Sequence, residues 1–281
     1  MAMPGRDRGI RCLCAAVGFR MVTALDGRDP AAVADDALLT RAHIVPFAVF
    51  MGFLLLLQLL VPFIAWDHPE APWWRRDPAH VVYPVQTLVC LALLFRFRRV
   101  YDFGLALKWV LPSVGFGLVG IACWLLPTML YDHWGLTGRP EGWLRWLGVD
   151  ARAKGFDPQV FEHPAAWWIA VVLRLLRAVV VVAFVEEIFW RGFLMRYIQR
   201  PDGDYWREPF GRGGWRSYGI VTLLFMLAHA PLDYAGAFVY GSLAWLLCVW
   251  SRSLGACVLM HAVANLTMGI FILKTGKYGL W

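Results

Sequence analysis

The stretch AFVEEIFWRGFL, at residues 183–194, places two adjacent acids, Glu186 and Glu187, inside an otherwise apolar run. The run extends from about 165 to 195, which is enough for a membrane-spanning helix of about 20 apolar residues. An acid at the centre of such a helix costs about 2.5–3.5 kcal/mol on an insertion scale, so it is a functional candidate by default. The stretch therefore predicts a transmembrane helix that carries a polar site.

The composition of the whole chain agrees with a membrane protein. Of its 281 residues, 59% are hydrophobic and 17% are charged, whereas a soluble domain has about 25% charged residues. The mean hydropathy is +0.54, and the 16 tryptophans suit membrane interfaces. These values exclude a soluble protein and predict an all-α polytopic membrane protein. The net charge of +7 is assigned to loops, not to nucleic-acid binding, because no basic cluster is interleaved with aromatic residues.

Seven apolar segments predict a bundle of about seven transmembrane helices with a membrane-buried polar cavity. The second is short and is interrupted by a proline. The fifth and sixth are short and separated by Asp233, which predicts a tight helical hairpin. In the fourth, Arg174 and Arg177 suggest that the first half lies outside the hydrocarbon, leaving about 178–195 to span. The segments run near 44–65, 80–95, 109–131, 165–195, 217–232, 235–250 and 254–273.

The chain divides by composition into an N-terminal segment, 1–43, a region of transmembrane helices with a long Trp-rich loop, 44–164, and a C-terminal core, 165–281. The N-terminal segment is expected in the cytoplasm or on the membrane surface. Alternate loops hold twice as many Lys and Arg residues as the loops between them. The positive-inside rule therefore places the N-terminus and the short loops 96–108 and 196–216 in the cytoplasm, and the C-terminus outside.

The cysteines predict neither a disulfide framework nor a metal site. Four of them lie in apolar runs, where Cys behaves as a small hydrophobe, and the pair near the N-terminus has no second pair to complete a metal site. The six are Cys12, Cys14, Cys90, Cys123, Cys248 and Cys257.

Helical spacing arranges the polar groups within the apolar segments. Glu187 and Arg191 are four residues apart, so they share a helix face and can pair. Glu186 points about 100° away, which leaves it free to act as a general base. His261 and Asn265 are also four apart and share one face.

The depth of these groups favours one shared site. At about 1.5 Å per residue, Glu186, His229, His261 and Asn265 all lie about 14–20 Å from basic residues at the cytoplasmic ends of their helices. Each alone would more often be structural, because a buried His is usually hydrogen-bonded and an Asn often joins membrane helices. Four polar groups on three helices at one depth favour a functional site.

The ordered motifs EExxxR, FxxxH and HxxxN resemble those of the CPBP family, the CAAX-processing and bacteriocin-immunity type intramembrane endopeptidases. The resemblance covers about residues 165–270, and its strength is the order of the three motifs, because each motif alone is weak. A Trp-rich run at 109–124 is similar to the exosortase-associated branch of CAAX-protease-related proteins. The residues that carry the motifs are Glu186, Glu187, Arg191, Phe225, His229, His261 and Asn265.

The resemblance implies a helical bundle whose cavity opens to the cytoplasm, and hydrolysis of a peptide bond near the C-terminus of a membrane-associated protein. It implies that Glu186 and His229 activate a water molecule, and that His261 and Asn265 stabilise the oxyanion. The residues expected to support the site are Glu187, Arg191 and, in the substrate pocket, Phe225.

A metal-dependent mechanism is the alternative to this glutamate mechanism. Glu186, His229 and His261 would be the zinc ligands, since zinc needs three protein ligands in a catalytic site. The chain has no HExxH motif, and Asn is a poor zinc ligand but a good oxyanion donor. We therefore expect no cofactor, with zinc as the second choice.

Two non-proteolytic functions compete with the endopeptidase. In a membrane scaffold or immunity protein, the same residues would form a structural polar network. In a transporter they would form a proton relay, but the paired broken helices typical of transporters are missing from the sequence. The expected partners are a membrane-associated protein substrate and the lipid bilayer, without nucleic acid, in a bacterial inner membrane.

Overall fold

The computed structural model describes residues 30–66, 68, 70–136, 142–201 and 204–281. The chain divides into two compact units after Leu38, and the unit of residues 39–281 holds every candidate site residue. The described residues are helical and contain no strand, which confirms the all-α expectation. Most of the N-terminal segment 1–43, including Cys12 and Cys14, lies outside the described residues.

Ten α-helices are described, joined in places by short 3₁₀ or π turns. The α-helices are α1 (Pro30–Ile64), α2 (Trp73–Arg76), α3 (Ala79–Phe97), α4 (Val110–His133), α5 (Pro164–Leu176), α6 (Ala183–Glu187), α7 (Met195–Gln199), α8 (Trp215–Leu227), α9 (Tyr234–Ser251) and α10 (Leu254–Thr275). The π-helical segments are η4 (Arg177–Val182) and η5 (Ile188–Leu194), and the 3₁₀ segments are η1 (Leu107–Trp109), η2 (Gly142–Leu147), η3 (Pro158–Val160), η6 (Tyr205–Arg207), η7 (Pro231–Asp233) and η8 (Tyr278–Leu280).

Six helical stretches among the described residues are long and apolar enough to cross a membrane. The fifth expected segment, 217–232, is the shorter helix α8, which ends at Leu227. The helix stops there because the His229 ring donates from Nδ1 to the Phe225 carbonyl at 2.7 Å, satisfying one of the carbonyls that a helix end leaves free. Pro231 follows and cannot continue the helix. The expected hairpin is present, since α8 and α9 pack together and Tyr218 is hydrogen-bonded to Ser242 at 3.0 Å.

The fourth segment is longer than the sequence suggested. Helices α5, η4, α6, η5 and α7 form one apolar helical run from Pro164 to Gln199. The two arginines in its first half are buried and face α3, with the Arg177 Nε donating to Gln86 Oε1 at 2.6 Å. Both guanidinium groups therefore point into the protein, and the expectation that only about 178–195 spans stays a prediction.

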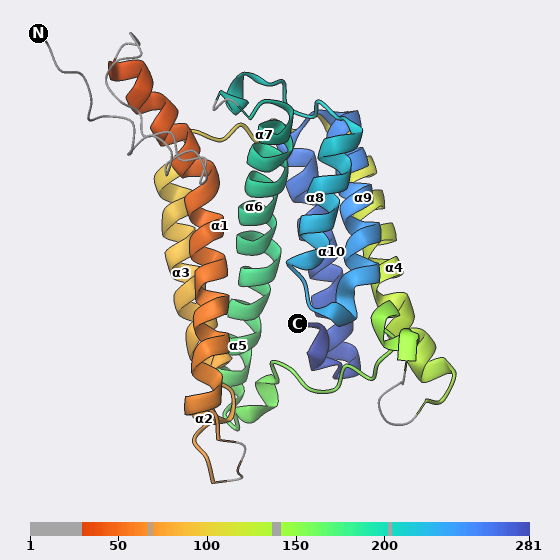
Figure 1. Cartoon of the computed structure of the whole chain (residues 1–281). Coiled ribbons are helices and arrows are strands. Elements are labelled where there is room, and N and C mark those ends of the chain that lie inside the picture. Colours follow the sequence, from red (N-terminus) through yellow and green to blue (C-terminus); the bar gives the residue numbers. More distant parts are fainter. Residues whose placement is uncertain (1–29, 67, 69, 137–141, 202–203) are drawn as a thin grey trace, which may run out of the picture. The chain divides into compact units, whose positions relative to one another are not determined.

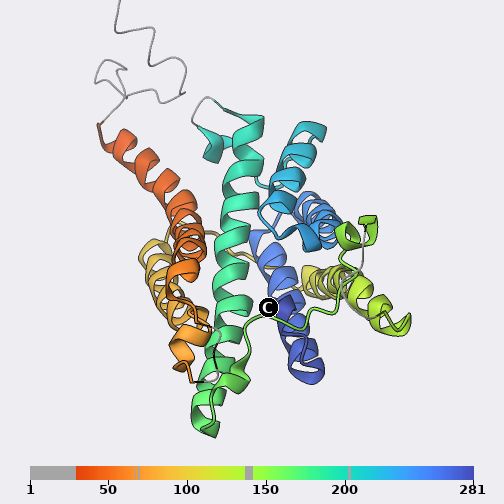
Figure 2. The same ribbon diagram turned by 60° about the horizontal axis from the view of Figure 1, so that its bottom comes forward.

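This long helix is the centre of the unit (Figures 1 and 2). On one side it packs against α1 and α3, where Phe50, Cys90, Val181 and Val185 form a buried cluster. On its other side it contacts α10, which in turn packs against α4 and α9. The central helix thus carries its polar residues between two apolar layers, where they must find partners within the protein.

Candidate functional site

The two acids of the first motif lie between two π-helical segments. Helix α6, which holds Glu186 and Glu187, is preceded by η4 and followed by η5. A π-helical turn disturbs the regular ladder of backbone hydrogen bonds and is frequent at functional sites. One backbone carbonyl of η4 accepts a hydrogen bond from another helix, because the Asn265 Nδ2 donates to the Ala178 oxygen at 2.7 Å.

Glu187 is the hub of the buried network. Its side chain is wholly buried, and its Oε1 accepts hydrogen bonds from Arg191 Nη1 at 3.1 Å and from His261 Nδ1 at 2.8 Å. The Arg191 pair is the one that the four-residue spacing predicted. The link to His261 joins the central helix to α10, which sequence spacing cannot reveal. A carboxylate that receives two charge-assisted bonds holds both partners in fixed positions.

The hydrogen bonds of the two histidines determine their tautomers. The His229 Nδ1 donates to a backbone carbonyl and the His261 Nδ1 donates to a carboxylate. Each neutral ring therefore carries its proton on Nδ1 and has a lone pair on Nε2. A second proton on His261 would sit on Nε2, and Glu187 would stabilise the resulting positive charge. The His229 ring is partly exposed and the His261 ring is buried.

Glu186 is buried, and its Oε2, like the Oε2 of Glu187, has no hydrogen-bond partner among the described residues. Unlike Glu187, it also forms no ion pair in the part of the chain that the structure describes. A buried carboxylate oxygen without a hydrogen-bond donor is costly to a fold. Such an atom calls for an explanation, and a bound water or a catalytic role is a common one. Its neighbour Glu187 is fixed by two partners, so the two adjacent acids occupy different environments.

Phe225 is a packing residue of the site. It is 1% exposed, its ring lies 4.6 Å from the His229 ring, and the Arg191 guanidinium lies 5.3 Å from its centroid. The arginine therefore contacts an aromatic face on one side and Glu187 on the other, which stabilises a cation that is buried away from water. Phe225 lies beside His229, as the sequence led us to expect. Its side chain is almost fully buried, so little of it could contact a substrate.

Two aromatic residues of the site were missed by the sequence reasoning. Tyr240 is buried, lies 5.5 Å from the His261 ring, and has a hydroxyl without a hydrogen-bond partner among the described residues. The Trp124 ring lies 5.3 Å from the His229 ring. Each of these two aromatic rings packs against a glycine of the neighbouring helix. A Cβ on Gly120 would lie 2.8 Å from Tyr240, and one on Gly236 would lie 2.8 Å from Trp124. The sequence signal that could have identified Tyr240 is its polar hydroxyl group within an apolar helix.

A polar clasp holds the turn that follows His229. The Asp233 Oδ1 accepts from Arg152 Nη2 at 2.7 Å and from Trp124 Nε1 at 3.1 Å. Arg152 also donates to the Leu232 carbonyl at 2.9 Å. The clasp thus fixes both the turn between α8 and α9 and the tryptophan that contacts the His229 ring.

The alternative zinc ligands do not form a metal site in this structure. Within the described residues, no three side chains of His, Cys, Asp or Glu come together in a geometry that would hold a metal ion. Of the three alternative ligands, His261 has its Nδ1 engaged by Glu187. We therefore derive no step through a metal, and metal dependence stays a prediction.

Residues 167–267 match a family model described as type II CAAX prenyl endopeptidase Rce1-like. All three sequence motifs fall within the matched residues. The match supports the CAAX protease family that the motifs had suggested, and a CAAX-type intramembrane endopeptidase in general. No curated protein and no solved structure matches the chain. The exosortase-associated branch stays a prediction.

Proposed function

We propose that the chain is an intramembrane endopeptidase in which Glu186 and His229 activate a water molecule without a metal ion. The observation that carries the proposal is the contrast between the two adjacent acids. Glu187 is paired with Arg191 and bonded to His261 through its Oε1, whereas the buried Glu186 carboxylate forms no ion pair among the described residues. A carboxylate that is not held in an ion pair can take a proton from water.

In the proposed reaction, the Glu186 carboxylate removes a proton from water while the His229 Nε2 lone pair accepts a hydrogen bond from the same water. The water oxygen forms a bond to the carbonyl carbon of the substrate, and the carbonyl oxygen becomes an oxyanion. The C–N bond then breaks, and the proton held by Glu186 passes to the leaving nitrogen. Atoms and charge balance without a further reactant.

The oxyanion is proposed to receive hydrogen bonds from His261 and Asn265. His261 can donate from Nε2 when it is protonated, with Glu187 stabilising the imidazolium. Asn265 uses one Nδ2 hydrogen on the Ala178 carbonyl, and the amide has a second hydrogen to donate. Preorganised donors of this kind supply much of the stabilisation of a tetrahedral intermediate.

The proposed substrate is a membrane-associated protein cleaved near its C-terminus. Hydrolysis within a bilayer requires a polar pocket that admits water, and the buried polar network of three helices is suited to that task. We further propose a bacterial inner membrane, with the N-terminus and the loops 96–108 and 196–216 in the cytoplasm, on the basis of loop charge.

A scaffold or immunity protein is the second candidate function. It is favoured by one observation, which is that Glu187, Arg191, His261 and Asn265 already bond to each other or to backbone. To separate the two, the membrane proteins of cells producing the wild-type chain would be compared with those of cells producing Glu186→Gln. Accumulation of the same uncleaved proteins in Glu186→Gln cells and in cells lacking the chain supports the enzyme. An unchanged set of proteins in both supports the scaffold.

A further inference from the structure

A second polar feature lies between α3 and α5, remote from the proposed catalytic residues. A cavity of about 230 Å³ is walled almost entirely by apolar and aromatic side chains, with Arg174 at its inner wall. Arg174 and Glu186 are twelve positions apart on one helix, or about 18 Å at 1.5 Å per residue. The cavity is therefore separate from the acids of the first motif. Its other lining residues include Trp73, Tyr83, Phe156, Phe161 and Ile169.

Arg174 is buried without a counter-ion. It is 5% exposed, and its Nε and Nη1 have no hydrogen-bond partner among the described residues. Its guanidinium carbon lies 4.7 Å from the Tyr83 ring centroid and 5.2 Å from that of Trp281. These rings stabilise the charge from their faces, but they leave the N–H groups in the guanidinium plane unsatisfied. A buried donor without an acceptor is costly, so an acceptor from outside the chain would relieve it.

The surroundings of Arg174 carry an excess of positive charge. Arg177, one turn further along, bonds to the neutral Gln86 and has no carboxylate partner in the described ranges. The acid near the start of α3, Asp77, directs its Oδ1 to the Ala79 N–H and its Oδ2 to His80 at 3.7 Å. Two cations thus share an apolar interface, which is complementary to an anion.

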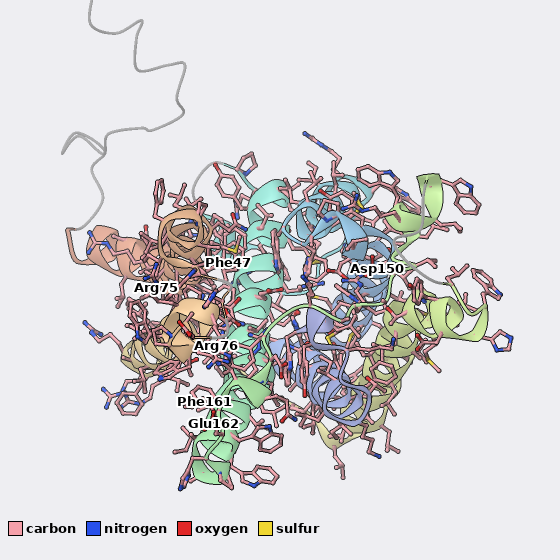
Figure 3. All side chains as sticks on the ribbon, turned by 90° about the horizontal axis from the view of Figure 1, so that it is seen from below. Phe47, Arg75, Arg76, Asp150, Phe161 and Glu162 are labelled. Carbon is pink, nitrogen blue, oxygen red and sulfur yellow. The ribbon has the colours of Figure 1, made fainter. Side chains whose placement is uncertain are left out.

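The mouth of the cavity faces the surroundings of a membrane-spanning helix. Ile169, which lines the cavity, is 59% exposed on the run Pro164–Gln199. Figure 3 views the end of the protein at which α3 and α5 begin, and it shows Phe161 close to the start of α5, with Arg75 and Arg76 on neighbouring segments. Helical side chains point back toward the N-terminal end of their helix, and for Arg174 this is the end at which α5 begins.

We propose that this cavity binds one acidic phospholipid, with its phosphate on Arg174 and an acyl chain against the aromatic wall. The observations select an amphiphile, because the wall is largely apolar and the arginine that lines it has two N–H groups, at Nε and Nη1, without an acceptor among the described residues. They select a lipid because the mouth is apolar and lies on a membrane-spanning helix. They select an acidic headgroup because neither Arg174 nor Arg177 has a carboxylate partner. The site goes beyond the proposed hydrolysis and does not depend on it.

Native mass spectrometry of the full chain, purified in detergent, tests this site. The protein is titrated with phosphatidylglycerol and with phosphatidylcholine of the same acyl chains. We expect one phosphatidylglycerol to bind roughly ten- to a hundredfold more tightly to the wild-type chain than to Arg174→Gln, the range for a charged hydrogen bond. The matched control is Arg145→Gln, which removes the same charge from an exposed position at η2. It should bind as the wild type does.

A second pair of variants leaves Arg174 in place and changes the volume of the cavity. Ala166 lines the cavity and Ala165 is exposed and does not. Ala166→Phe should weaken phosphatidylglycerol binding by a similar factor, and Ala165→Phe should leave it unchanged. If Arg174→Gln fails to fold, this pair of variants still tests whether the lipid binds in the cavity. Equal binding of the two lipids to the wild-type chain, or wild-type binding by both Arg174→Gln and Ala166→Phe, would overturn the proposal.

Discussion

The Oε1 atom of Glu187 and the Nδ1 atom of His261 are joined by a 2.8 Å hydrogen bond between two buried side chains. The bond connects the central membrane helix to α10 and fixes the tautomer of the histidine. Arg191 shares the same carboxylate oxygen at 3.1 Å. Three of the motif residues therefore form one unit, so substitutions within it should affect folding and activity together.

Arg191→Ala should destabilise the protein. It leaves Glu187 as a buried charge with only a histidine partner, and breaking a buried ion pair costs about 3–5 kcal/mol. The control is Arg207→Ala, because Arg207 forms an ion pair with Asp204 and its side chain is exposed. Surface pairs contribute about 0–1 kcal/mol. Thermal unfolding in detergent measures both, and equal losses of stability would contradict the buried hub.

Asn265→Ala should reduce turnover more than folding. Loss of one oxyanion donor costs about 10²–10³ in kcat in a soluble protease, while loss of its bond to the Ala178 carbonyl should cost about 1 kcal/mol of stability. Thr267→Ala, on the same helix, is the control, since its hydroxyl bonds only to the Val263 carbonyl among the described residues. A destabilised Asn265→Ala protein with unchanged kcat would assign this residue to the support of the π-helical segment alone.

Chelators should leave the activity of the purified protein intact, because the proposed mechanism activates water with Glu186 and His229. Activity is measured after treatment with EDTA or phenanthroline, with a zinc protease treated alongside to verify that metal is removed. Loss of activity that returns with added zinc would reject the glutamate mechanism and support the zinc alternative.

The orientation is tested by labelling introduced cysteines with an impermeant thiol reagent in intact cells. Arg212→Cys lies in the loop 196–216, and Trp143→Cys lies at an exposed position of the opposite loop. We expect Arg212→Cys to be shielded and Trp143→Cys to be labelled, in a chain whose exposed Cys123 is replaced by Ser. Labelling of Arg212→Cys from outside would reverse the proposed orientation.

The parts of the fold and site that depend on spacing along one helix could be predicted from the sequence. Glu187 and Arg191 pair as expected because four residues return a helix to the same face. Partners far apart in the sequence could not be predicted, which is why Tyr240 and Trp124 were missed. The early end of α8 has a local cause, a bond from the His229 ring to the Phe225 carbonyl, which the apolar pattern does not reveal.

The surroundings of the two arginines in the fourth segment could not be predicted from the sequence. Arg174 and Arg177 are expensive only if they face lipid. Here they face Tyr83 and Gln86 on α3, so the helix can remain apolar on its outer face along its full length. The packing partner of a charged side chain decides whether that charge faces lipid, and the sequence of one helix does not identify the partner.

The most direct test of the account is the turnover of Glu186→Gln on a membrane protein that accumulates in cells lacking the chain. The substitution keeps the size of the side chain and removes the base. Glu162→Gln makes the same change at an exposed position and serves as the control. We predict that both proteins insert and unfold at the wild-type temperature, that Glu162→Gln retains wild-type turnover, and that Glu186→Gln loses it. A Glu186→Gln protein that cleaves its substrate at the wild-type rate would contradict the assignment of Glu186 as the base.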